Sequence, residues 1–336
     1  MTQQSTLSPE ITAGNPVLAE VVRSGFTESR HRGAVVALAP DGEVLLSAGA
    51  VGVPVFPRSS NKPMQAAAML RCGLDLDGHL LALAAASHSG EDFHLAGARE
   101  ILARAGLAEE ALQCPPDLPG DEAAKRALLR AGGGEDRVHM NCSGKHAAML
   151  ATCVAAGWDT TTYTRPDHPL QIEIRATIER LAGERITVPP GVDGCGAPLF
   201  AISLTGLARA FGTLASAEPG SAERRVADAM RANPAWTSGS RRPDRALVDA
   251  VPGLLLKSGA EGVHGMALAD GRGVAFKIDD GDGARRARIA VAVALLRELG
   301  AGDLPGTDRA VLHDLAAPPV YGGGREVGEI RATLPF

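Results

Sequence analysis

Strand-like patterns first occur near the N-terminal end of the chain. Residues 35–38 and 43–48 are apolar or alternate with polar positions, and they flank Asp41-Gly42. An Asp-Gly pair between two such segments is typical of a tight hairpin turn, so two antiparallel strands are predicted here. Residues 1–25 carry weaker signals and predict a loose arm or an edge element.

The strand signal returns only near the C-terminal end. Residues 254–257, 263–268 and 274–278 are short and apolar or β-branched, and each predicts a strand. Asp270-Gly271 supplies a turn between the last two. Residues 327–331 predict a further strand at the edge of the sheet.

Between these ends, apolar residues recur every three or four positions, as they do along one face of a helix. Helices are expected from residue 61 onward and at residues 80–86, 94–105, 122–131, 145–156, 169–181, 199–211, 222–232, 244–250 and, after the late strands, 285–299. Residues 51–58 and 187–198 are rich in proline and glycine, so the first predicts a connection and the second a structured loop.

This order predicts an α+β fold. Because no regular alternation of strand and helix appears, a doubly wound parallel sheet is not expected. We expect one domain over residues 1–336, with an antiparallel sheet from about residues 30–56 and 254–331. A helical subdomain, about residues 60–250, would pack beside it. Hydrophobic residues make up 45% of the chain and aromatic residues only 3%, so the core must consist mainly of aliphatic side chains.

Charge and sequence pattern exclude several classes of protein. The formal net charge of −5 provides no basic surface for nucleic acid or anionic membranes. No uninterrupted apolar stretch approaches 18 residues, and no export signal is visible, so a cytoplasmic protein without membrane spans is expected. The five cysteines are loosely spaced and odd in number, which favours reduced thiols.

The scarcity of lysine directs attention to a serine three residues before one. Only five of the 34 basic residues are lysines, and a buried lysine can lose its proton whereas arginine cannot. Ser59 and Lys62 in Arg58-Ser59-Ser60-Asn61-Lys62 would share one face at the start of a helix. A neutral lysine there would activate the serine as a nucleophile. Such a pair alone is a weak signal.

Two further segments strengthen this interpretation. Ser87-His88-Ser89-Gly90-Glu91 is a polar cluster directly after an apolar helix, where it would otherwise be a capped helix end. Lys257-Ser258-Gly259 ends an apolar strand, and Lys-Ser/Thr-Gly occurs with Ser-x-x-Lys in serine acyl-transfer enzymes. Lys125 and Lys277, by contrast, are expected to be ordinary surface lysines.

A separate set of residues suggests a metal or thiol site. Cys142, Lys145 and His146 would share a helical turn, and Cys195 lies in a loop rich in glycine and proline. Spacing alone indicates that the two thiols and the imidazole of His146 would bind zinc. Two other interpretations stay open: separate buried thiols, or Cys195 as a nucleophile with His146 as its base.

Seven segments together resemble a known family. They are Pro57-Arg58-Ser59-Ser60-Asn61-Lys62-Pro63, Ala86-Ser87-His88-Ser89-Gly90-Glu91, Asn141-Cys142-Ser143-Gly144-Lys145-His146, Pro166-Asp167-His168-Pro169, Gly191-Val192-Asp193-Gly194-Cys195-Gly196-Ala197-Pro198, Lys257-Ser258-Gly259-Ala260-Glu261-Gly262 and Lys277-Ile278-Asp279-Asp280-Gly281. In this order, from about residue 15 to 331, they resemble the asparaginase II family. These are the Rhizobium-etli-type L-asparaginases, which are distinct from the threonine-nucleophile asparaginases.

The resemblance implies a fold similar to serine β-lactamases and serine glutaminases, and a homodimer that hydrolyses L-asparagine to L-aspartate and ammonia. It implies two Ser-Lys tandems, matched here by Ser59 with Lys62 and by Ser87 with Lys257. Ser60 and Ser89 stand where the family often has other residues, so the choice of hydroxyl rests on register.

The resemblance also implies a zinc site at the positions of Cys142, Lys145 and Cys195. It thus places a neutral Lys145 where spacing alone suggests His146. Whether this zinc orients the substrate or holds the site together stays open.

The expected mechanism has neutral Lys62 removing the proton of Ser59, which attacks the side-chain amide. The Ser87 and Lys257 pair would protonate the departing ammonia. The candidates for substrate binding are Arg58 for the α-carboxylate, Asp193 or Glu261 for the α-ammonium, and His146. Three alternatives stay open: a cysteine-dependent amidase that uses Cys195, a non-catalytic amino-acid binding protein, and an enzyme that reacts with β-lactams.

Overall fold

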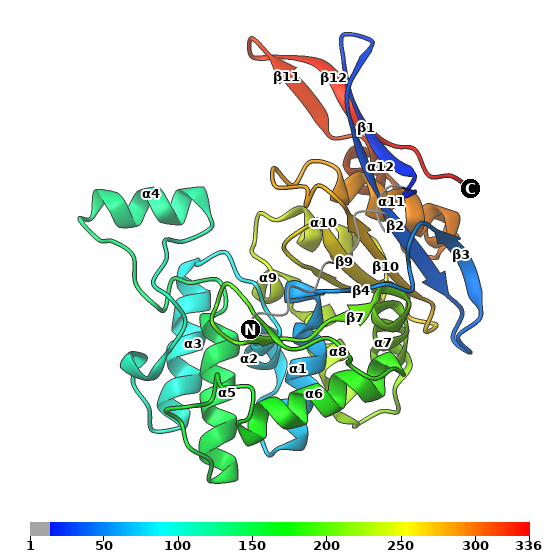
Figure 1. Ribbon diagram of the computed structural model, residues 1–336. Helices are drawn as coiled ribbons and strands as arrows, with labels where there is room; N and C mark the ends of the chain where they lie inside the picture. Colours follow the sequence, from blue (N-terminus) through cyan, green and yellow to red (C-terminus); the bar gives the residue numbers. More distant parts are fainter. Residues whose placement is uncertain (1–13) are drawn as a thin grey trace, which may run out of the picture.

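The two ends of the chain form one antiparallel sheet. The computed structural model describes residues 14–336. Its main sheet has eight strands: β1 Val17–Arg23, β2 Phe26–Leu38, β3 Val44–Ala48, β8 Leu255–Ser258, β9 Val263–Ala267, β10 Gly273–Ile278, β11 Pro319–Gly322 and β12 Arg325–Ala332. The order is β11-β12-β1-β2-β10-β9-β8, with β3 paired to β2, and every pairing is antiparallel. In Figure 1 the blue N-terminal strands accordingly lie beside the red C-terminal ones.

The central strand β2 divides its side chains between two cores. Because successive side chains of a strand point to opposite faces, Ala34, Val36 and Leu38 enter one core and Val35 and Ala37 the other. The first core contains the helical part of the chain, and α7 covers that face of the sheet. The second core lies against α11 on the opposite face. The sheet is therefore buried on both sides in the region that leads to β8.

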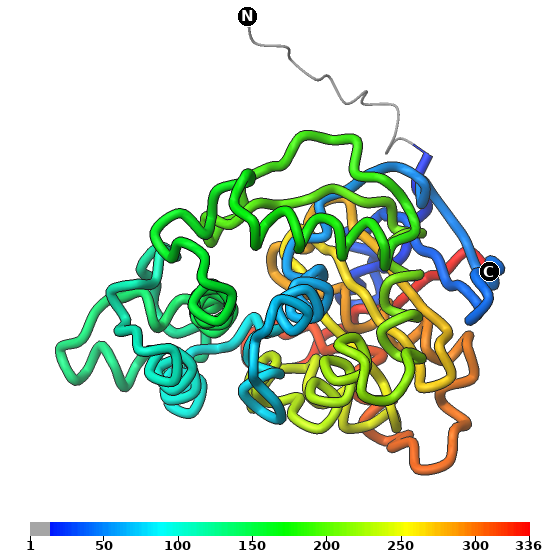
Figure 2. Tube along the Cα trace, turned by 90° about the horizontal axis from the view of Figure 1, so that it is seen from below, coloured from blue at the N-terminus to red at the C-terminus, as the bar shows by residue number. Residues whose placement is uncertain are grey.

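Twelve α-helices are present in residues 14–336: α1 Lys62–Arg71, α2 Gly78–Ala84, α3 Asp92–Arg104, α4 Glu122–Arg130, α5 Ser143–Ala156, α6 Pro169–Ala182, α7 Leu204–Ser216, α8 Ala222–Ala232, α9 Pro234–Thr237, α10 Pro243–Ala250, α11 Arg288–Glu298 and α12 Arg309–Ala316. Helix α1 is buried on all sides from Lys62 to Leu70, which fits its mostly apolar composition. Figure 2 shows the cyan and green helical segments gathered beside the sheet.

Short elements connect the two parts. A 3₁₀ turn, η2 Arg58–Asn61, precedes α1, and two further 3₁₀ turns are η3 Glu109–Ala111 and η4 Ala301–Asp303. Two small two-stranded sheets pair β4 Pro54–Val55 with β7 Ile202–Ser203, and β5 Gly191–Val192 with β6 Pro198–Leu199. The loops predicted at residues 51–58 and 187–198 therefore contain short strands.

The predicted α+β class, with strands from both chain ends and helices between, is confirmed. The prediction for residues 1–25 is wrong where the structure describes it, because β1 lies inside the sheet between β12 and β2. The segment at residues 327–331 is a strand, but β11 lies outside it, so it is not at the edge. Residues 1–13 lie outside the described part of the chain.

Two predicted helices begin later than expected. The helix predicted from residue 199 begins at Leu204, because β6 and β7 occupy the preceding residues and Ser203 caps the helix through Gly206 N at 2.8 Å. The helix predicted from residue 285 begins at Arg288, where Asp282 accepts the first amides. Within residues 14–336, no helix has both the length and the apolar character needed to cross a membrane.

Candidate active site

A pocket of about 210 Å³ lies where the helical part meets the sheet. From the helical part it is lined by Ser59, Ser87, Asn141, Cys142 and residues 193–195; from the sheet side it is lined by residues 257–260, Arg285 and Arg288. Three segments singled out by sequence, around Ser59, Ser87 and Lys257, therefore converge on one cavity. Such a junction between two parts of a fold is a common place for a ligand site.

The first segment places Ser59 at the start of helix α1. Pro57 precedes the 3₁₀ turn η2, in which Arg58 adopts a left-handed backbone conformation with φ of 51°. Ser59 is half-buried and lines the pocket, whereas the hydroxyl of Ser60 is buried and donates to the backbone oxygen of Lys257 at 3.0 Å. Of these two adjacent serines, Ser59 is therefore the one that lines the pocket. Ser60 instead connects η2 to β8 through its hydrogen bond.

Lys62 does not contact Ser59 through any hydrogen bond in the described structure. Its side chain is 1% exposed, and its ammonium group donates to Ala86 O at 2.5 Å, Ser87 Oγ at 2.9 Å and Cys142 Sγ at 3.0 Å. Three donors with three acceptors are what a protonated lysine requires. The lysine three positions after Ser59 therefore contacts Ser87 in space, and within the described residues no hydrogen bond joins Lys257 to either serine.

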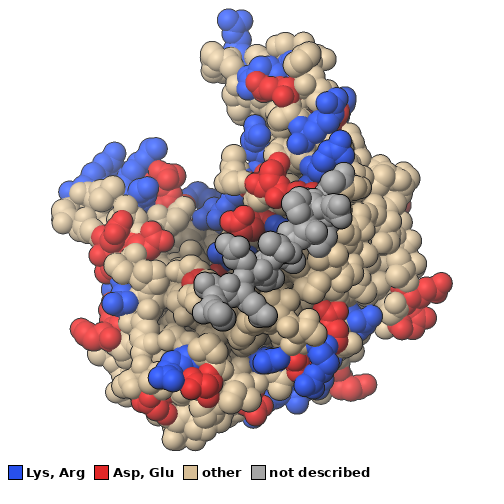
Figure 3. All heavy atoms as spheres, in the orientation of Figure 1, with Lys and Arg blue, Asp and Glu red and all other residues tan. Residues whose placement is uncertain are grey.

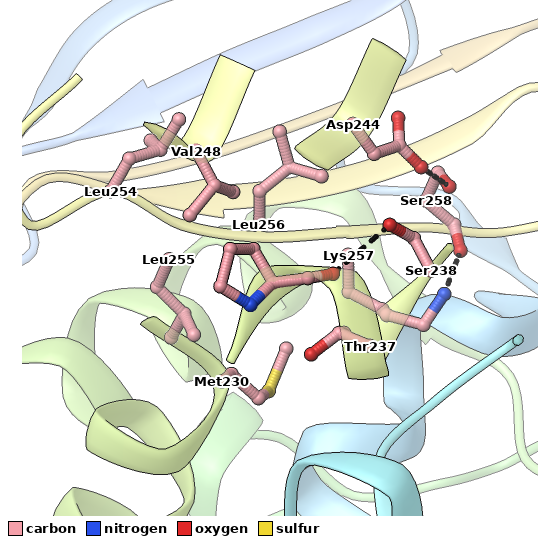
Figure 4. A pocket seen from close by; sticks show the side chains of 11 residues that line it. Met230, Thr237, Ser238, Asp244, Val248, Leu254, Leu255, Leu256, Lys257 and Ser258 are labelled. Carbon is pink, nitrogen blue, oxygen red and sulfur yellow. Dashed lines mark hydrogen bonds between the residues drawn. The ribbon is translucent and has the colours of Figure 1, made fainter. Parts of the chain in front are cut away.

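Lys257 lies in very different surroundings. It is 2% exposed at the end of β8, and its ammonium group has one hydrogen bond, to Ser258 O at 2.8 Å. Burial is the largest cause that lowers the pKa of Lys257 to about 7, and the charge of Lys62 adds to it. Figure 4 shows its side chain between the apolar Leu256 and Met230 on one side and the polar Ser238 and Ser258 on the other.

Asp244 supports the Lys257 end of the pocket, although no sequence motif indicated it. It lies on α10 and accepts a hydrogen bond from Ser258 Oγ at 2.5 Å, which Figure 4 shows as a dashed line. Although burial raises the pKa of Asp244, the charge of His264 and the Ser258 hydroxyl hold it below its ordinary value. The cavity between these groups is about 10 Å³, which is roughly the space of one water molecule.

Arg58 forms a second cluster at the pocket. Its Nε donates to Asp193 Oδ1 at 2.8 Å, and its Nη1 lies 3.7 Å from Glu261 Oε1. Three of the four predicted substrate-binding residues therefore lie together, next to Ser59. An arginine beside two carboxylates is able to bind both the carboxylate and the ammonium of an α-amino acid.

The thiols of Cys142 and Cys195 are buried at the pocket wall. The hydrogen bond between the two thiols is the largest cause that lowers the pKa of Cys195. The same hydrogen bond, followed by burial, raises the pKa of Cys142. Lys145 Nζ lies 3.0 Å from Cys195 Sγ, and although burial opposes it, the charge on the two sulfurs raises the pKa of this lysine. All five cysteines are free thiols.

His146 is not part of the pocket wall. It is completely buried, and its Nδ1 lies 2.7 Å from the hydroxyl of Tyr163. Its Nε2 is a buried nitrogen without a hydrogen-bond partner of good geometry among residues 14–336, although it faces Cys195 closely enough to lower the pKa of that thiol. The structure therefore places His146 behind Cys195 and gives no support to its predicted contact with substrate.

The donor set at this wall suits zinc. Two sulfurs and the amine of Lys145 are soft or borderline ligands, and His146 Nε2 is a further nitrogen without a partner. Within residues 14–336, no group of three or more His, Cys, Asp or Glu side chains is placed to hold a metal ion. Cys142, Cys195 and His146 are therefore not placed as such a group, whereas Lys145 is not one of these residue types.

Backbone strain gathers around the pocket. Five non-glycine residues of the described chain have positive φ: Ser24, Arg58, Glu261, Asp282 and Arg285. Arg58 and Arg285 line the pocket, Glu261 pairs with Arg58, and Asp282 pairs with the lining Arg288 at 3.0 Å. Such conformations cost free energy and persist mainly where a site requires them. Sequence gave no sign of these positions because none of them is glycine.

Three further residues were named from the sequence: Ser89, Lys125 and Lys277. Ser89 does not line this pocket, and its hydroxyl donates to Glu91 at 2.8 Å, so Ser87 is the pocket serine of that segment. Lys125 and Lys277, predicted to be surface lysines, are both half-buried, and Lys277 donates to Glu261 O at 2.6 Å. Arg242 and Arg285 line the pocket and were missed, because an arginine in a loop carries no distinctive pattern.

Several solved structures are similar to this chain. One is Mglu in its native form in the presence of 4.3 M NaCl, at 16% identity and a TM-score of 0.45, over 87% of this chain and 66% of that one. Another structure of native Mglu has 17% identity to this chain and a TM-score of 0.44, over 89% of this chain and 71% of that one. A β-lactamase from Mycobacterium bovis has 14% identity and a TM-score of 0.44, over 86% of this chain and 98% of that one. The chain thus spans about two thirds of Mglu.

Sequence comparison identifies the family. No curated protein matches the chain by sequence. The profile described as L-asparaginase II matches residues 19–332, from the first strand of the sheet to the last. That range contains every residue of the pocket and all seven segments on which the resemblance rested. The chain belongs to the L-asparaginase II family, which supports an amidohydrolase-type role.

Proposed function

We propose that this protein hydrolyses the side-chain amide of L-asparagine to L-aspartate and ammonia, through an acyl-enzyme on Ser59. Family membership supports the reaction class. The observation that carries the proposal is the convergence of Ser59, Ser87 and Lys257 on one pocket beside the Arg58–Asp193 ion pair. A nucleophile, a base and a site for an α-amino acid are then within one cavity.

The contacts of the two lysines favour an assignment different from the one sequence suggested. Lys62 donates three hydrogen bonds and is best written as an ammonium ion. Lys257 donates one, and its lowered pKa of about 7 leaves a large neutral fraction near neutral pH. Lys257 is therefore proposed as the base that accepts the proton of Ser59, in place of Lys62.

In the proposed acylation, Ser59 Oγ attacks the amide carbon while its proton passes to neutral Lys257. The carbon–nitrogen bond then breaks. The departing nitrogen takes a proton from the hydroxyl of Ser87, which Lys62 replenishes through their 2.9 Å hydrogen bond. Ammonia leaves, with Lys257 now charged and Lys62 neutral.

Deacylation reverses these proton transfers. Water attacks the ester, and its proton returns through Ser87 to Lys62. The bond to Ser59 breaks as Lys257 gives its proton back to the serine oxygen. Aspartate leaves and both lysines regain their starting charges, so the cycle consumes one water for each amide hydrolysed.

Substrate orientation is proposed for the Arg58 cluster. One face of the Arg58 guanidinium would bind the α-carboxylate, and Asp193 with Glu261 would bind the α-ammonium. The strained backbone at Arg58 fixes this cluster next to Ser59. Selectivity for asparagine over glutamine would then depend on the distance from this cluster to the serine.

Zinc is proposed as the resident metal, held by Cys142, Lys145 and Cys195 with His146 as the alternative nitrogen ligand. When bound, it would supply positive charge that keeps both sulfurs as thiolates and fixes the residue 193–195 loop against α5. Zinc analysis of the purified protein, with Lys145→Met and His146→Ala compared, tests which nitrogen is a ligand.

Two wider properties are proposed with this function: the homodimer that the family resemblance implies, and the cytoplasmic location that the sequence pattern predicts. Light scattering of the purified protein tests the first. Fractionation of cells that express it tests the second.

A cysteine nucleophile is the second candidate mechanism. The lowered pKa of Cys195 and its place in the pocket wall favour it, since a thiolate is a ready nucleophile. Zinc bound at that sulfur would leave no free thiolate. Ammonia release from L-asparagine by Ser59→Ala and Cys195→Ala proteins separates the two: retained activity in Ser59→Ala contradicts an acyl-enzyme on Ser59. Binding of asparagine by the unaltered protein without ammonia release would instead indicate a binding protein.

A further inference from the structure

Four arginines line the pocket, and they differ in whether a carboxylate neutralises them. Arg58 is paired with Asp193, and Arg288 is paired with Asp282 at 3.0 Å. Arg242 and Arg285 have no ion pair with any residue of the described chain, 14–336. The single side-chain hydrogen bond of Arg242 is long, 3.4 Å to Gly120 O. Two guanidinium groups are therefore available at this pocket.

These two charges lie close enough to oppose each other. Burial, followed by the charges of Arg242 and Arg288, lowers the pKa of Arg285. Asp244 and Asp282 partly offset these charges, but neither forms an ion pair with Arg285, because Asp244 accepts from Ser258 and Asp282 is paired with Arg288. Arg285 also adopts a positive φ of 54°. An anion between Arg242 and Arg285 would add to the partial compensation that these carboxylates provide.

The two unpaired arginines share one cavity with the Arg58 cluster. This cavity of about 210 Å³ is lined by Arg58, Ser59, Arg242 and Arg285. If the α-amino acid end occupies the Arg58 cluster, a larger substrate can extend only from its amide nitrogen.

We propose that Arg242 and Arg285 form a subsite for a carboxylate carried by the leaving amine. The substrate class would be β-aspartyl amides in which the side-chain carbonyl of aspartate is joined to the nitrogen of a second amino acid. This inference rests on the proposed function. The same carbon–nitrogen bond breaks, one water is consumed, and the products are aspartate and a free amino acid. Figure 3 shows how basic side chains also gather over the neighbouring α4, which adds positive charge on this side.

The fork geometry of arginine supports a carboxylate as the ligand. Each guanidinium group offers several N–H donors in one plane, and these match the two oxygens of a carboxylate. In an amino acid joined through its nitrogen, that carboxylate lies one carbon beyond the amide nitrogen. A short leaving group therefore suffices to bring it toward the unpaired arginines.

The test compares β-aspartylglycine with its C-terminal amide, β-aspartylglycinamide, which differs only in lacking the charge. For the unaltered protein, kcat/KM for the acid is expected to exceed that for the amide by about tenfold, the effect of one charge-assisted hydrogen-bond pair. Arg242→Gln and Arg285→Gln should each move this ratio toward one. Arg286→Gln is the matched control, because Arg286 is exposed, adjacent and outside the pocket lining.

Ammonia release from L-asparagine, measured in parallel, separates the two proposals. If ammonia is released from asparagine but the two dipeptides have equal kcat/KM, or neither is cleaved, the subsite proposal is wrong. The proposed function is unaffected by that result. No release from asparagine overturns the proposed function. A ratio that is unchanged in both arginine variants also overturns the subsite. Because the ratio in the unaltered protein is itself a readout, a variant that fails to fold does not remove the test.

Discussion

Lys62 and Lys257 are both nearly completely buried, and both belong to Ser-Lys pairs that sequence singled out, yet their ammonium groups have different surroundings. Lys62 is held by a carbonyl, a hydroxyl and a thiol. Lys257 has one carbonyl acceptor, and neither its apolar neighbours nor nearby Ser238 and Asp244 accept a hydrogen bond from it. Burial alone therefore does not decide the charge of a lysine, because the number of acceptors within reach decides whether the ammonium is compensated.

The largest effect is expected at the nucleophile. Ser59→Ala should lower kcat for L-asparagine by at least about 10⁴-fold, since the acyl-enzyme cannot form. Ser87→Ala should cost less, roughly 10²–10³-fold, because it removes one proton relay rather than the attacking atom. Ammonia release measured on both purified variants decides the order. A greater loss in Ser87→Ala would make Ser87, with Lys62 beside it, the nucleophile.

The next effect separates the two lysines. Lys257→Met should lower kcat about 10²–10⁴-fold while leaving the thermal midpoint nearly unchanged, because it replaces a poorly compensated amine with an apolar chain. Lys62→Met should lower both kcat and the thermal midpoint. Three acceptors lose their donor in this variant, which costs roughly 1–3 kcal/mol or more in unfolding free energy. Thermal unfolding and turnover are measured on the same samples. Equal loss of stability in the two variants would remove the proposed difference.

A smaller effect is expected at the substrate cluster. Arg58→Gln should raise KM for L-asparagine about tenfold or more, since the α-carboxylate loses its charged partner. It should change kcat less, because Arg58 does not transfer a proton in the proposed mechanism. Steady-state kinetics of Arg58→Gln and Asp193→Asn check this. A change confined to kcat would place Arg58 in the chemical step instead.

The smallest effect is expected at Lys125, the matched lysine control on α4. Lys125 is half-buried, lies outside the pocket and is in a helix with no buried residues. Lys125→Met should keep turnover within about twofold and the unfolding free energy within about 0.5 kcal/mol. A large loss of turnover would show that lysine replacement disturbs this protein wherever it occurs, and would weaken the comparison of Lys62 with Lys257.

Local patterns explain which parts of the fold were predictable. Asp41-Gly42 and Asp270-Gly271 marked real turns between strands, and the apolar segment before Lys257 formed β8 as expected. Strand β1 was missed, although Ser24-Gly25 marks the turn after it and both residues have positive φ. The sheet partner of β1 is β12, more than 300 positions away, so no local pattern identifies it as an inner strand.

The site was predictable as a set of residues but not as a set of contacts. Lysine scarcity and the motifs brought Ser59, Ser87 and Lys257 to attention, and they do share a pocket. The contact of Lys62 with Ser87 depends on how α1 packs against the residues that follow α2. Helical spacing along the sequence does not predict that packing. Asp244 and Arg285 carry no motif, because their roles come from neighbours far away in sequence.

The pH dependence of kcat/KM for L-asparagine tests the central claim most directly. Lys257 acts as a base only when neutral, and its pKa is lowered to about 7. We expect kcat/KM to be low below that pH, to rise tenfold per pH unit as the lysine loses its proton, and to level off above an apparent pKa near 7. A rise that continues toward pH 10, or a profile that is flat from pH 5 to 9, would contradict Lys257 as the base.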